Sequence, residues 1–282
     1  MVNLKLTKRK EKMIKRTLVY ILFLLVTSIS FSQELSYKTV KNISYYPDET
    51  VGLTEYQRAQ CRLDIYYPEG KKDVPVIVWF HGGGLTGGGK EIPQALKNEG
   101  YCIVGVGYRL SPKVKAATCI DDATAAVAWA FKNITDYNGD PDSIFVSGHS
   151  AGGYLALMAV MDKGRLAKYD IDANDVAGLV PFSGHTITHF TIRSERGIPG
   201  EQPIIDKFAP LYFVRNDAPP TLLITGDREL EMLGRFEENA YFYRMMKVAG
   251  QEHITQYEMQ GYGHNMTHPA FPLLIKFIQE HK

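Results

Sequence analysis

The chain has 282 residues, of which 45% are hydrophobic, with 32 Lys and Arg against 31 Asp and Glu and a formal net charge of +1. This composition is too apolar for a disordered chain, and the near-neutral charge argues against a dedicated nucleic-acid-binding protein. Three cysteines are too few for a disulfide framework, and the length suits one large α/β domain.

The first thirty-two residues have the pattern of a cleaved secretory signal. Basic residues crowd the start, an apolar run covers 18–26, and small residues precede a cut after Ser32. The apolar run is shorter than the about 20 residues that span a bilayer. We therefore expect residues 1–32 to direct export to the periplasm or medium, with Met1 or Met13 as the start.

Removal of this segment changes the charge of the chain. Residues 1–32 hold seven basic residues and one acidic residue, so residues 33–282 carry 25 basic and 30 acidic residues and a net charge of −5. A chain of that charge is a poor ligand for nucleic acids or anionic membranes. All three cysteines remain, and an odd number leaves at least one free thiol.

Strand-like and helix-like segments alternate after residue 60. We expect strands at 61–67, 74–80, 102–108, 144–147, 178–183, 221–225 and 255–259, and helices at 123–131, 154–161, 236–248 and 272–280. This alternation predicts a single domain with a mostly parallel central sheet and helices on both faces. The segment 184–220, rich in Gly and Pro, interrupts the pattern and predicts a short cap-like insertion over the active site.

A serine lies between the predicted strand at 144–147 and the predicted helix at 154–161. Gly148-His149-Ser150-Ala151-Gly152 matches G-x-S-x-G. The glycines allow a sharp turn that lifts the serine hydroxyl above the sheet at a helix N-terminus, where developing negative charge is stabilised. The pattern predicts Ser150 as the nucleophile of a serine hydrolase.

A glycine-rich segment, H-G-G-G at residues 81–84, follows another predicted strand. In serine hydrolases with this elbow, such a loop turns backbone N–H groups toward the oxyanion of the tetrahedral intermediate, and glycine leaves room for the substrate. We expect Gly83 and Gly84 to be donors in an oxyanion hole, joined by the N–H of Ala151. We expect His81 to orient the loop.

Chain order selects the general base, because these hydrolases carry their triad in the order Ser, acid, His. Of the eight histidines, His264 follows the last predicted strand directly, within Gly261-Tyr262-Gly263-His264. The sequence therefore predicts His264 as the base, with His268 in reserve.

Two carboxylates compete for the place of the triad acid. The predicted strand at 221–225 runs into Gly226-Asp227-Arg228-Glu229. The third residue after the glycine carries the carboxylate in many hydrolases, which favours Glu229 and leaves Asp227 as the alternative. The unused acid is expected to cap the loop.

These motifs together resemble the α/β-hydrolase superfamily, and within it the hormone-sensitive-lipase-like and feruloyl-esterase-like carboxylesterases. The matching segments are Leu63-Asp64-Ile65-Tyr66, His81–Gly84, Tyr108–Pro112, Asp121-Asp122, Gly148–Gly153, Asp217–Pro220 and Gly263-His264. The resemblance extends from about residue 45 to the C-terminus. A glutamate at 229 departs from the more usual aspartate.

The resemblance implies an α/β-hydrolase fold and hydrolysis of carboxylic esters through an acyl-enzyme, without a metal or cofactor. Short-chain acyl, aryl or acylated-carbohydrate esters are the expected substrates, with no nucleic acid and no stable membrane anchor. A peptidase or an arylformamidase on the same fold is the alternative, and an inactive binding module is a second. The sequence does not indicate an oligomeric state.

Overall fold

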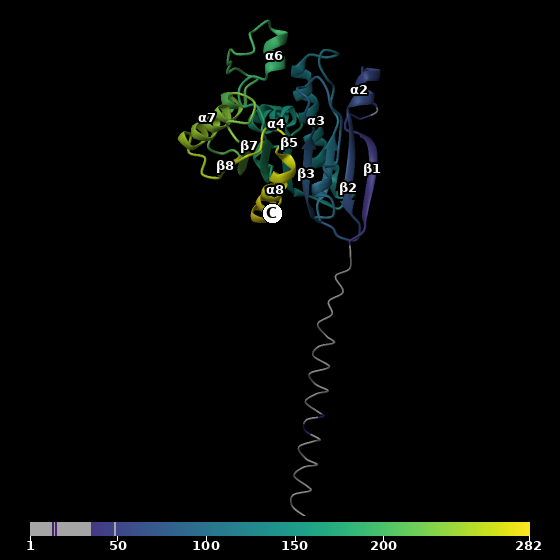
Figure 1. Ribbon diagram of the computed structural model, residues 1–282. Helices are drawn as coiled ribbons and strands as arrows, with labels where there is room; N and C mark the ends of the chain where they lie inside the picture. The colour runs from purple at the N-terminus through teal and green to yellow at the C-terminus, as the bar shows by residue number, and fades with distance from the viewer. Residues whose placement is uncertain (1–12, 14, 16–34, 48) are drawn as a thin grey trace, which may run out of the picture. The chain divides into compact units, whose positions relative to one another are not determined.

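The computed structural model describes residues 13, 15, 35–47 and 49–282 (Figure 1). Its contacts divide the chain into two units, residues 1–34 and 35–282, and the fold described here is that of the second unit. The predicted secretory signal at 1–32 lies outside the described residues, apart from Met13 and Lys15.

Eight strands form one sheet in the order β1-β2-β4-β3-β5-β6-β7-β8. The strands are β1 (Tyr37–Ser44), β2 (Arg62–Pro68), β3 (Val74–Phe80), β4 (Cys102–Val106), β5 (Gly139–His149), β6 (Gly178–Phe182), β7 (Thr221–Gly226) and β8 (Ile254–Met259). Strand β2 is antiparallel to both of its neighbours, and every pairing from β4 to β8 is parallel. The sheet is therefore mostly parallel, as the sequence predicts.

Helices pack on both faces of this sheet. The α-helices of this unit are α2 (Glu55–Gln60), α3 (Ala116–Asn133), α4 (Ala151–Met161), α5 (Lys163–Ala167), α6 (Phe190–Glu195), α7 (Arg235–Val248) and α8 (Thr267–His281). Side chains of α3, α4 and α7 share one apolar cluster with alternate residues of the central strands, and α8 packs in a second cluster on the opposite face. The predicted layering is thus confirmed.

Strand β3 shows why the central strands appear in the sequence as continuous apolar runs. Val76, Val78 and Phe80 belong to the cluster under α3 and α4, whereas Ile77 and Trp79 belong to the cluster under α8. Successive side chains of a strand point to opposite faces, so a strand covered on both sides must be apolar at every position.

A buried ion pair fixes the loop after β4 to helix α3. Asp122 has no exposed surface, and its carboxylate accepts hydrogen bonds from Nε of Arg109 at 2.8 Å and Nη2 of Arg109 at 2.6 Å. The Tyr46 hydroxyl and the Arg109 backbone N–H also donate to this carboxylate. These four bonds satisfy a charge that would be costly to bury alone. They also give a structural role to two of the segments that carry the resemblance, Tyr108–Pro112 and Asp121-Asp122.

The structure also corrects several expected boundaries and contains elements that the sequence does not predict. Helix α3 begins at Ala116 rather than near 123, because its N-terminus has no side-chain cap that would mark it in the sequence. Strand β5 begins at Gly139, five residues before the apolar stretch that predicts it. The edge strand β1 and the short helices α2, α5 and α6 were not predicted. Among the described residues, no helix has the length and hydropathy needed to cross a bilayer.

Candidate active site

Ser150 lies at the junction of β5 and α4 in a strained backbone conformation. Its φ and ψ are 55° and −116°, outside the regions that residues with a Cβ ordinarily adopt. Its N–H donates to the carbonyl of Phe182 on the neighbouring strand, at 2.8 Å. This bond and the packing around it hold the backbone in the strained conformation, which places the hydroxyl at the sharp turn expected of a nucleophile elbow.

The turn is possible because glycines stand on both sides of the serine. A Cβ at Gly148 would lie 2.6 Å from the carbonyl oxygen of Phe80, and a Cβ at Gly152 would lie 2.0 Å from the same oxygen. Both distances are far shorter than any real contact of a methyl group. The two glycines of the G-x-S-x-G motif therefore have two roles. They allow the sharp turn, and they let the turn pack closely against strand β3.

His264 lies opposite this hydroxyl, on the loop between β8 and α8. Its Nε2 is 2.9 Å from Ser150 Oγ, which is a hydrogen-bonding distance. The structure thus brings together the nucleophile and the base that the sequence predicts. His268 is exposed at the start of α8, and the structure gives it no contact with Ser150.

The carboxylate on His264 belongs to Glu231, which corrects the sequence-based assignment. Its Oε1 lies 2.6 Å from Nδ1 of His264. Glu229 is exposed and its side chain makes no hydrogen bond to His264. Asp227 is the loop cap, since its carboxylate accepts from the backbone N–H groups of Glu229 at 3.0 Å and Gly261 at 2.9 Å.

Glu231 is buried in a cage of donors. Besides His264, the Ser183 hydroxyl donates to its Oε2 at 2.5 Å, the N–H of Gly226 to Oε2 at 3.1 Å, and the N–H of Met232 to Oε1 at 2.8 Å. Burial by itself raises the pKa of Glu231, but these hydrogen bonds outweigh it and lower the pKa to about 2. Glu231 is therefore ionised at neutral pH and can stabilise an imidazolium.

A second histidine, His149, forms a hydrogen bond to the backbone of His264. His149, directly before the nucleophile, donates from Nε2 to the carbonyl of His264 at 2.8 Å. Burial lowers the pKa of His149 to about 4, so this ring is neutral at physiological pH. The x position of the G-x-S-x-G motif thus fixes the loop that carries the base.

The glycine-rich loop after β3 lies against the nucleophile. A Cβ at Gly82 would be 3.5 Å from Cβ of Ser150, and Gly83 and Gly84 adopt positive φ of 111° and 63°. At the other side, Ala151 is the first residue of α4, where helix N–H groups have no partner within the helix. The loop therefore lies where backbone donors can face an oxygen bound at Ser150.

His81 orients this loop and does not contact Ser150. Its ring stacks on Tyr108 with centroids 4.3 Å apart, and the Tyr108 hydroxyl donates to the His81 carbonyl at 2.7 Å. Burial lowers the pKa of His81. Burial thus favours the neutral form of the ring, which packs against Tyr108 within the loop.

Part of the segment 184–220 packs on the same loop. The Thr191 hydroxyl donates to the carbonyl of Gly84 at 2.6 Å, and a Cβ at Gly84 would be 3.2 Å from the Phe190 ring. Both residues belong to α6, which lies at the top of the view in Figure 1. This part of the segment 184–220 therefore contacts the glycine-rich loop directly.

The arrangement can transfer a proton away from a nucleophilic hydroxyl. Ser150 Oγ, His264 and Glu231 form one hydrogen-bonded chain, and the His264 side chain keeps 23% exposure while Glu231 has none. Sequence reasoning missed Glu231 because the turn after β7 is two residues longer than the Gly-x-x-acid spacing assumes. The only available signal was a third acid on the same turn.

Comparison with known proteins places the chain in a family. A family model described as BD-FAE matches residues 63–232, more than half of the chain. This confirms the resemblance to esterases of the α/β-hydrolase superfamily.

Three similar proteins show the extent of the likeness. The chain is 29% identical over 224 residues to Esterase LipQ of Mycobacterium tuberculosis, covering 71% of this chain and 51% of the relative. It is 29% identical over 191 residues to Carboxylesterase NlhH of the same organism, covering 60% and 56%. The chain thus spans about half the length of these curated relatives. A truncated carbohydrate esterase from gut microbiota superposes with a TM-score of 0.71 at 20% identity, covering 89% of this chain and 98% of that one, which establishes the α/β-hydrolase fold.

Proposed function

Because the chain belongs to the BD-FAE family, we propose that it is a serine hydrolase that cleaves carboxylic esters through an acyl-enzyme intermediate. The observation that carries the proposal is the hydrogen-bonded chain from Ser150 Oγ through His264 to the buried Glu231. A nucleophile, a base and an ionised acid in this geometry are the parts that acyl transfer requires.

Each group has one role in the proposed reaction. Ser150 Oγ attacks the ester carbonyl carbon while His264 Nε2 takes its proton, and the tetrahedral intermediate expels the alcohol, which receives that proton from His264. Water then attacks the acyl-enzyme, again losing its proton to His264, and the acid product leaves as Ser150 regains its hydrogen. Glu231 holds the imidazole tautomer and stabilises the imidazolium throughout.

Backbone N–H groups stabilise the oxyanion of both tetrahedral intermediates in the proposed reaction. We infer that Gly83, Gly84 and Ala151 donate their N–H groups to it, as supported by the position of the glycine loop beside Ser150. Loss of one donor of this kind typically costs about 3 kcal/mol of transition-state stabilisation.

Apolar side chains around the triad support a small ester with an apolar acyl or aryl group as substrate. Leu230, Met232 and Leu233 flank or follow the triad acid, Tyr262 stands two residues before the base, and all four are between 45% and 100% exposed. Exposed apolar side chains next to the acid and the base in the chain offer contact surface to an apolar acyl or aryl group. The fold shared with a carbohydrate esterase supports acylated carbohydrates as a further class.

The test begins with a fluorophosphonate probe, which modifies an activated serine. We expect labelling of the wild-type protein and none of Ser150→Ala, with both proteins folded by circular dichroism. Aryl acetate, feruloyl ester, acetyl-sugar and aminoacyl amide substrates then compare the esterase with the amide-cleaving alternatives. Absence of labelling of the folded wild type would refute the proposal. Turnover of the amide alone would replace the esterase by the amide-cleaving alternative, a peptidase or an arylformamidase.

We further propose that residues 1–32 direct export, supported by the basic start, the apolar run and the small residues before the cut. Expression of the full chain in a bacterial host and N-terminal sequencing of the periplasmic or secreted product tests this. A mature N-terminus near residue 33 is expected. An intact N-terminus retained with the cytoplasm would contradict it.

A further inference from the structure

Ser183, the first residue after β6, contacts both the acid and the base of the triad. Its hydroxyl donates to Glu231 Oε2 at 2.5 Å and lies 3.2 Å from His264 Nδ1. The side chain is fully buried, and no sequence motif singled it out. We propose that Ser183 is a positioning residue of the triad, which fixes the carboxylate of Glu231, and that a buried cluster of charged side chains holds Ser183 in place. This inference rests on the proposed function.

The bonding of the Glu231 carboxylate shows what Ser183 contributes. Each oxygen accepts one backbone N–H, from Met232 on Oε1 and from Gly226 on Oε2. Each oxygen also has one side-chain hydrogen-bond partner, which is His264 for Oε1 and Ser183 for Oε2. Without the serine hydroxyl, Oε2 keeps a single 3.1 Å bond, and the carboxylate gains freedom to rotate away from His264.

The backbone of Ser183 is held in a conformation that serine avoids. Its φ is 50°, in the left-handed region that favours glycine. Such a conformation persists only where surrounding contacts determine it. Its N–H donates to the carbonyl of Ile224 at 2.7 Å, and its carbonyl accepts from Nη1 of Arg235. Ser183 is thus bonded on both sides of its backbone and through its hydroxyl.

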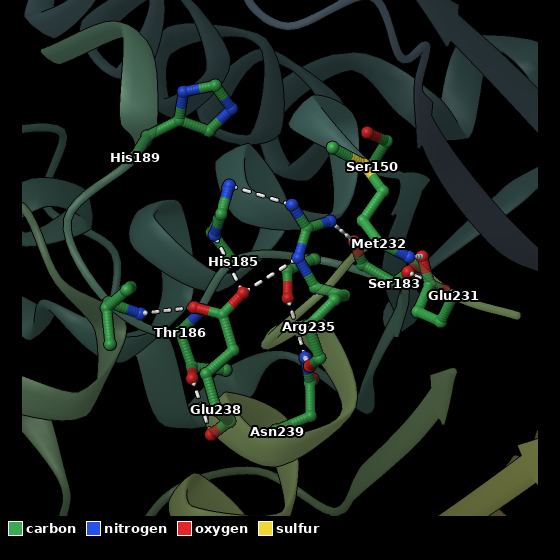
Figure 2. Close-up of polar contacts among 12 residues, drawn as sticks. Ser150, Ser183, His185, Thr186, His189, Glu231, Met232, Arg235, Glu238 and Asn239 are labelled. Atoms are coloured by element: carbon green, nitrogen blue, oxygen red, sulfur yellow. Dashed lines mark hydrogen bonds and ion pairs between the residues drawn. The ribbon is translucent and has the colours of Figure 1, made fainter. Parts of the chain in front are cut away.

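Arg235 belongs to a buried cluster with His185 and Glu238, shown in Figure 2. Its Nε donates to Glu238 Oε1 at 2.7 Å, and its Nη2 donates to His185 Nε2 at 2.7 Å. Because Nε2 of His185 accepts, its Nδ1 carries the proton and faces Glu238 Oε1 at 2.7 Å. All three residues are less than a tenth exposed.

The cluster makes no hydrogen bond to Ser150, His264 or Glu231, and the bond from Arg235 to the Ser183 carbonyl is the direct contact through which we propose that it acts on the triad. The Arg235 backbone N–H also donates to the carbonyl of Met232, next to Glu231, at 2.9 Å. A buried ion pair adds little net stability relative to well-packed apolar side chains, because desolvation offsets its attraction. A rigid guanidinium, by contrast, can direct three donors at three fixed acceptors at once. Here those acceptors are His185, Glu238 and the carbonyl of Ser183, so the cluster sets the position of that carbonyl.

The first experiment separates the hydroxyl from the backbone. Ser183→Gly removes the hydroxyl but tolerates the positive φ, whereas Ser183→Ala removes the hydroxyl and keeps the strain. We expect both variants to lose about ten- to a hundredfold in kcat on an aryl acetate, the loss expected for a hydrogen bond to a charged group. Ser147→Ala is the matched control, because Ser147 is also fully buried and its hydroxyl donates to the Val180 carbonyl. The control should keep kcat within twofold.

The pH profile distinguishes positioning from general loosening. A carboxylate that has lost a donor attracts the Nδ1 proton of His264 more strongly, so the acidic limb of kcat/KM should move to higher pH in Ser183→Gly. A kcat within twofold of wild type, or an acidic limb that does not move upward, overturns the role of Ser183. If the wild-type protein neither labels nor turns over esters, the proposed function fails instead.

A double-mutant cycle tests the cluster. Arg235→Lys keeps the charge but cannot reach three acceptors, so we expect a smaller loss in kcat than for Ser183→Gly. If Arg235 acts through Ser183, the substitution should have little further effect in the Ser183→Gly background. Losses that multiply, or no loss from Arg235→Lys in the otherwise wild-type protein, would refute this part of the inference.

Discussion

Glu231 and His264 come from the turns after two adjacent parallel strands, and they meet with 2.6 Å between Oε1 and Nδ1. The two turns are also joined by the bond from the Gly261 N–H to Asp227. Three hydrogen bonds from Arg228 to Glu258, two from its side chain and one from its backbone N–H, tie the turn after β7 to strand β8. The distance between acid and base is therefore set by the register of β7 and β8 together with these cross-links. Changes in either turn should affect the reaction through this distance.

Three carboxylates on the β7 turn should respond differently to neutralisation. Glu231→Gln should lower kcat about a thousandfold or more, because an amide disturbs the tautomer of His264. Glu229→Gln should stay within twofold, because that side chain is exposed and has no contact with His264. Steady-state kinetics with an aryl acetate on folded variants measures this. A large loss in Glu229→Gln with little in Glu231→Gln would return the acid to position 229.

Asp227→Asn should weaken the turn without abolishing turnover, since Asp227 bonds two backbone N–H groups and not the imidazole. A several-fold fall in kcat with a lowered melting temperature is expected. Loss as complete as that of Ser150→Ala would show that Asp227 has a direct part in the reaction.

The acid-induced unfolding of the protein should depend on Glu231. Its pKa is lowered from 4.5 to about 2 in the folded state, so the unfolded chain binds more protons between these values. The stabilisation is thus fully present above pH 4.5 and is lost as the pH falls toward 2, by at most about 3 kcal/mol. Denaturant unfolding at several pH values should show a flatter acid dependence in Glu231→Gln than in wild type. Parallel curves would contradict the low pKa.

Gly152→Ala should destabilise the elbow, because the new Cβ would lie 2.0 Å from the Phe80 carbonyl oxygen. Overpacking against backbone typically costs about 1–3 kcal/mol, and the displaced turn should also reduce labelling of Ser150 by the fluorophosphonate. Gly89→Ala is the control, because a Cβ there meets no atom within 4 Å. Equal melting temperatures for the two variants would contradict the close approach.

The three cysteines should be unreactive in the native protein. Cys61, Cys102 and Cys119 are free thiols with at most 1% exposure. Burial raises the pKa of Cys61 and of Cys119 to about 12 and also raises the pKa of Cys102, so little thiolate forms at neutral pH. A thiol-disulfide reagent should titrate no thiol in native protein and three after denaturation. Rapid reaction of the native protein would show that one of these sites opens.

The central sheet could be predicted because strands that are buried on both faces are apolar at nearly every position. Val74–Phe80 and the strand at Cys102–Val106 are nearly continuous apolar runs. Strand β1 could not be predicted in the same way, because it pairs on one side only and most of its residues are partly or fully exposed. Its position depends on pairing with β2, which local sequence does not specify.

Some residues of the candidate site could be predicted from local sequence, and others could not. Ser150 and His264 could be predicted because a strained turn requires glycines on both sides of the serine, and because the base must follow the last strand. Glu231 depends on the length of the turn, and Ser183 depends on a hydrogen bond between residues 48 positions apart. Contacts of that range follow from the folded sheet and have no signature in local spacing.

The short turn after β7 carries both the acid that contacts His264 and a group of exposed apolar side chains. Glu231 points inward to the base, while Leu230, Met232 and Leu233 on the same short turn are exposed to solvent. Insertions or deletions here would alter the surface offered to a ligand and displace the acid in the same event. Variation in selectivity, whether by evolution or by engineering, should therefore accumulate more readily by side-chain replacement on this turn than by changes in its length.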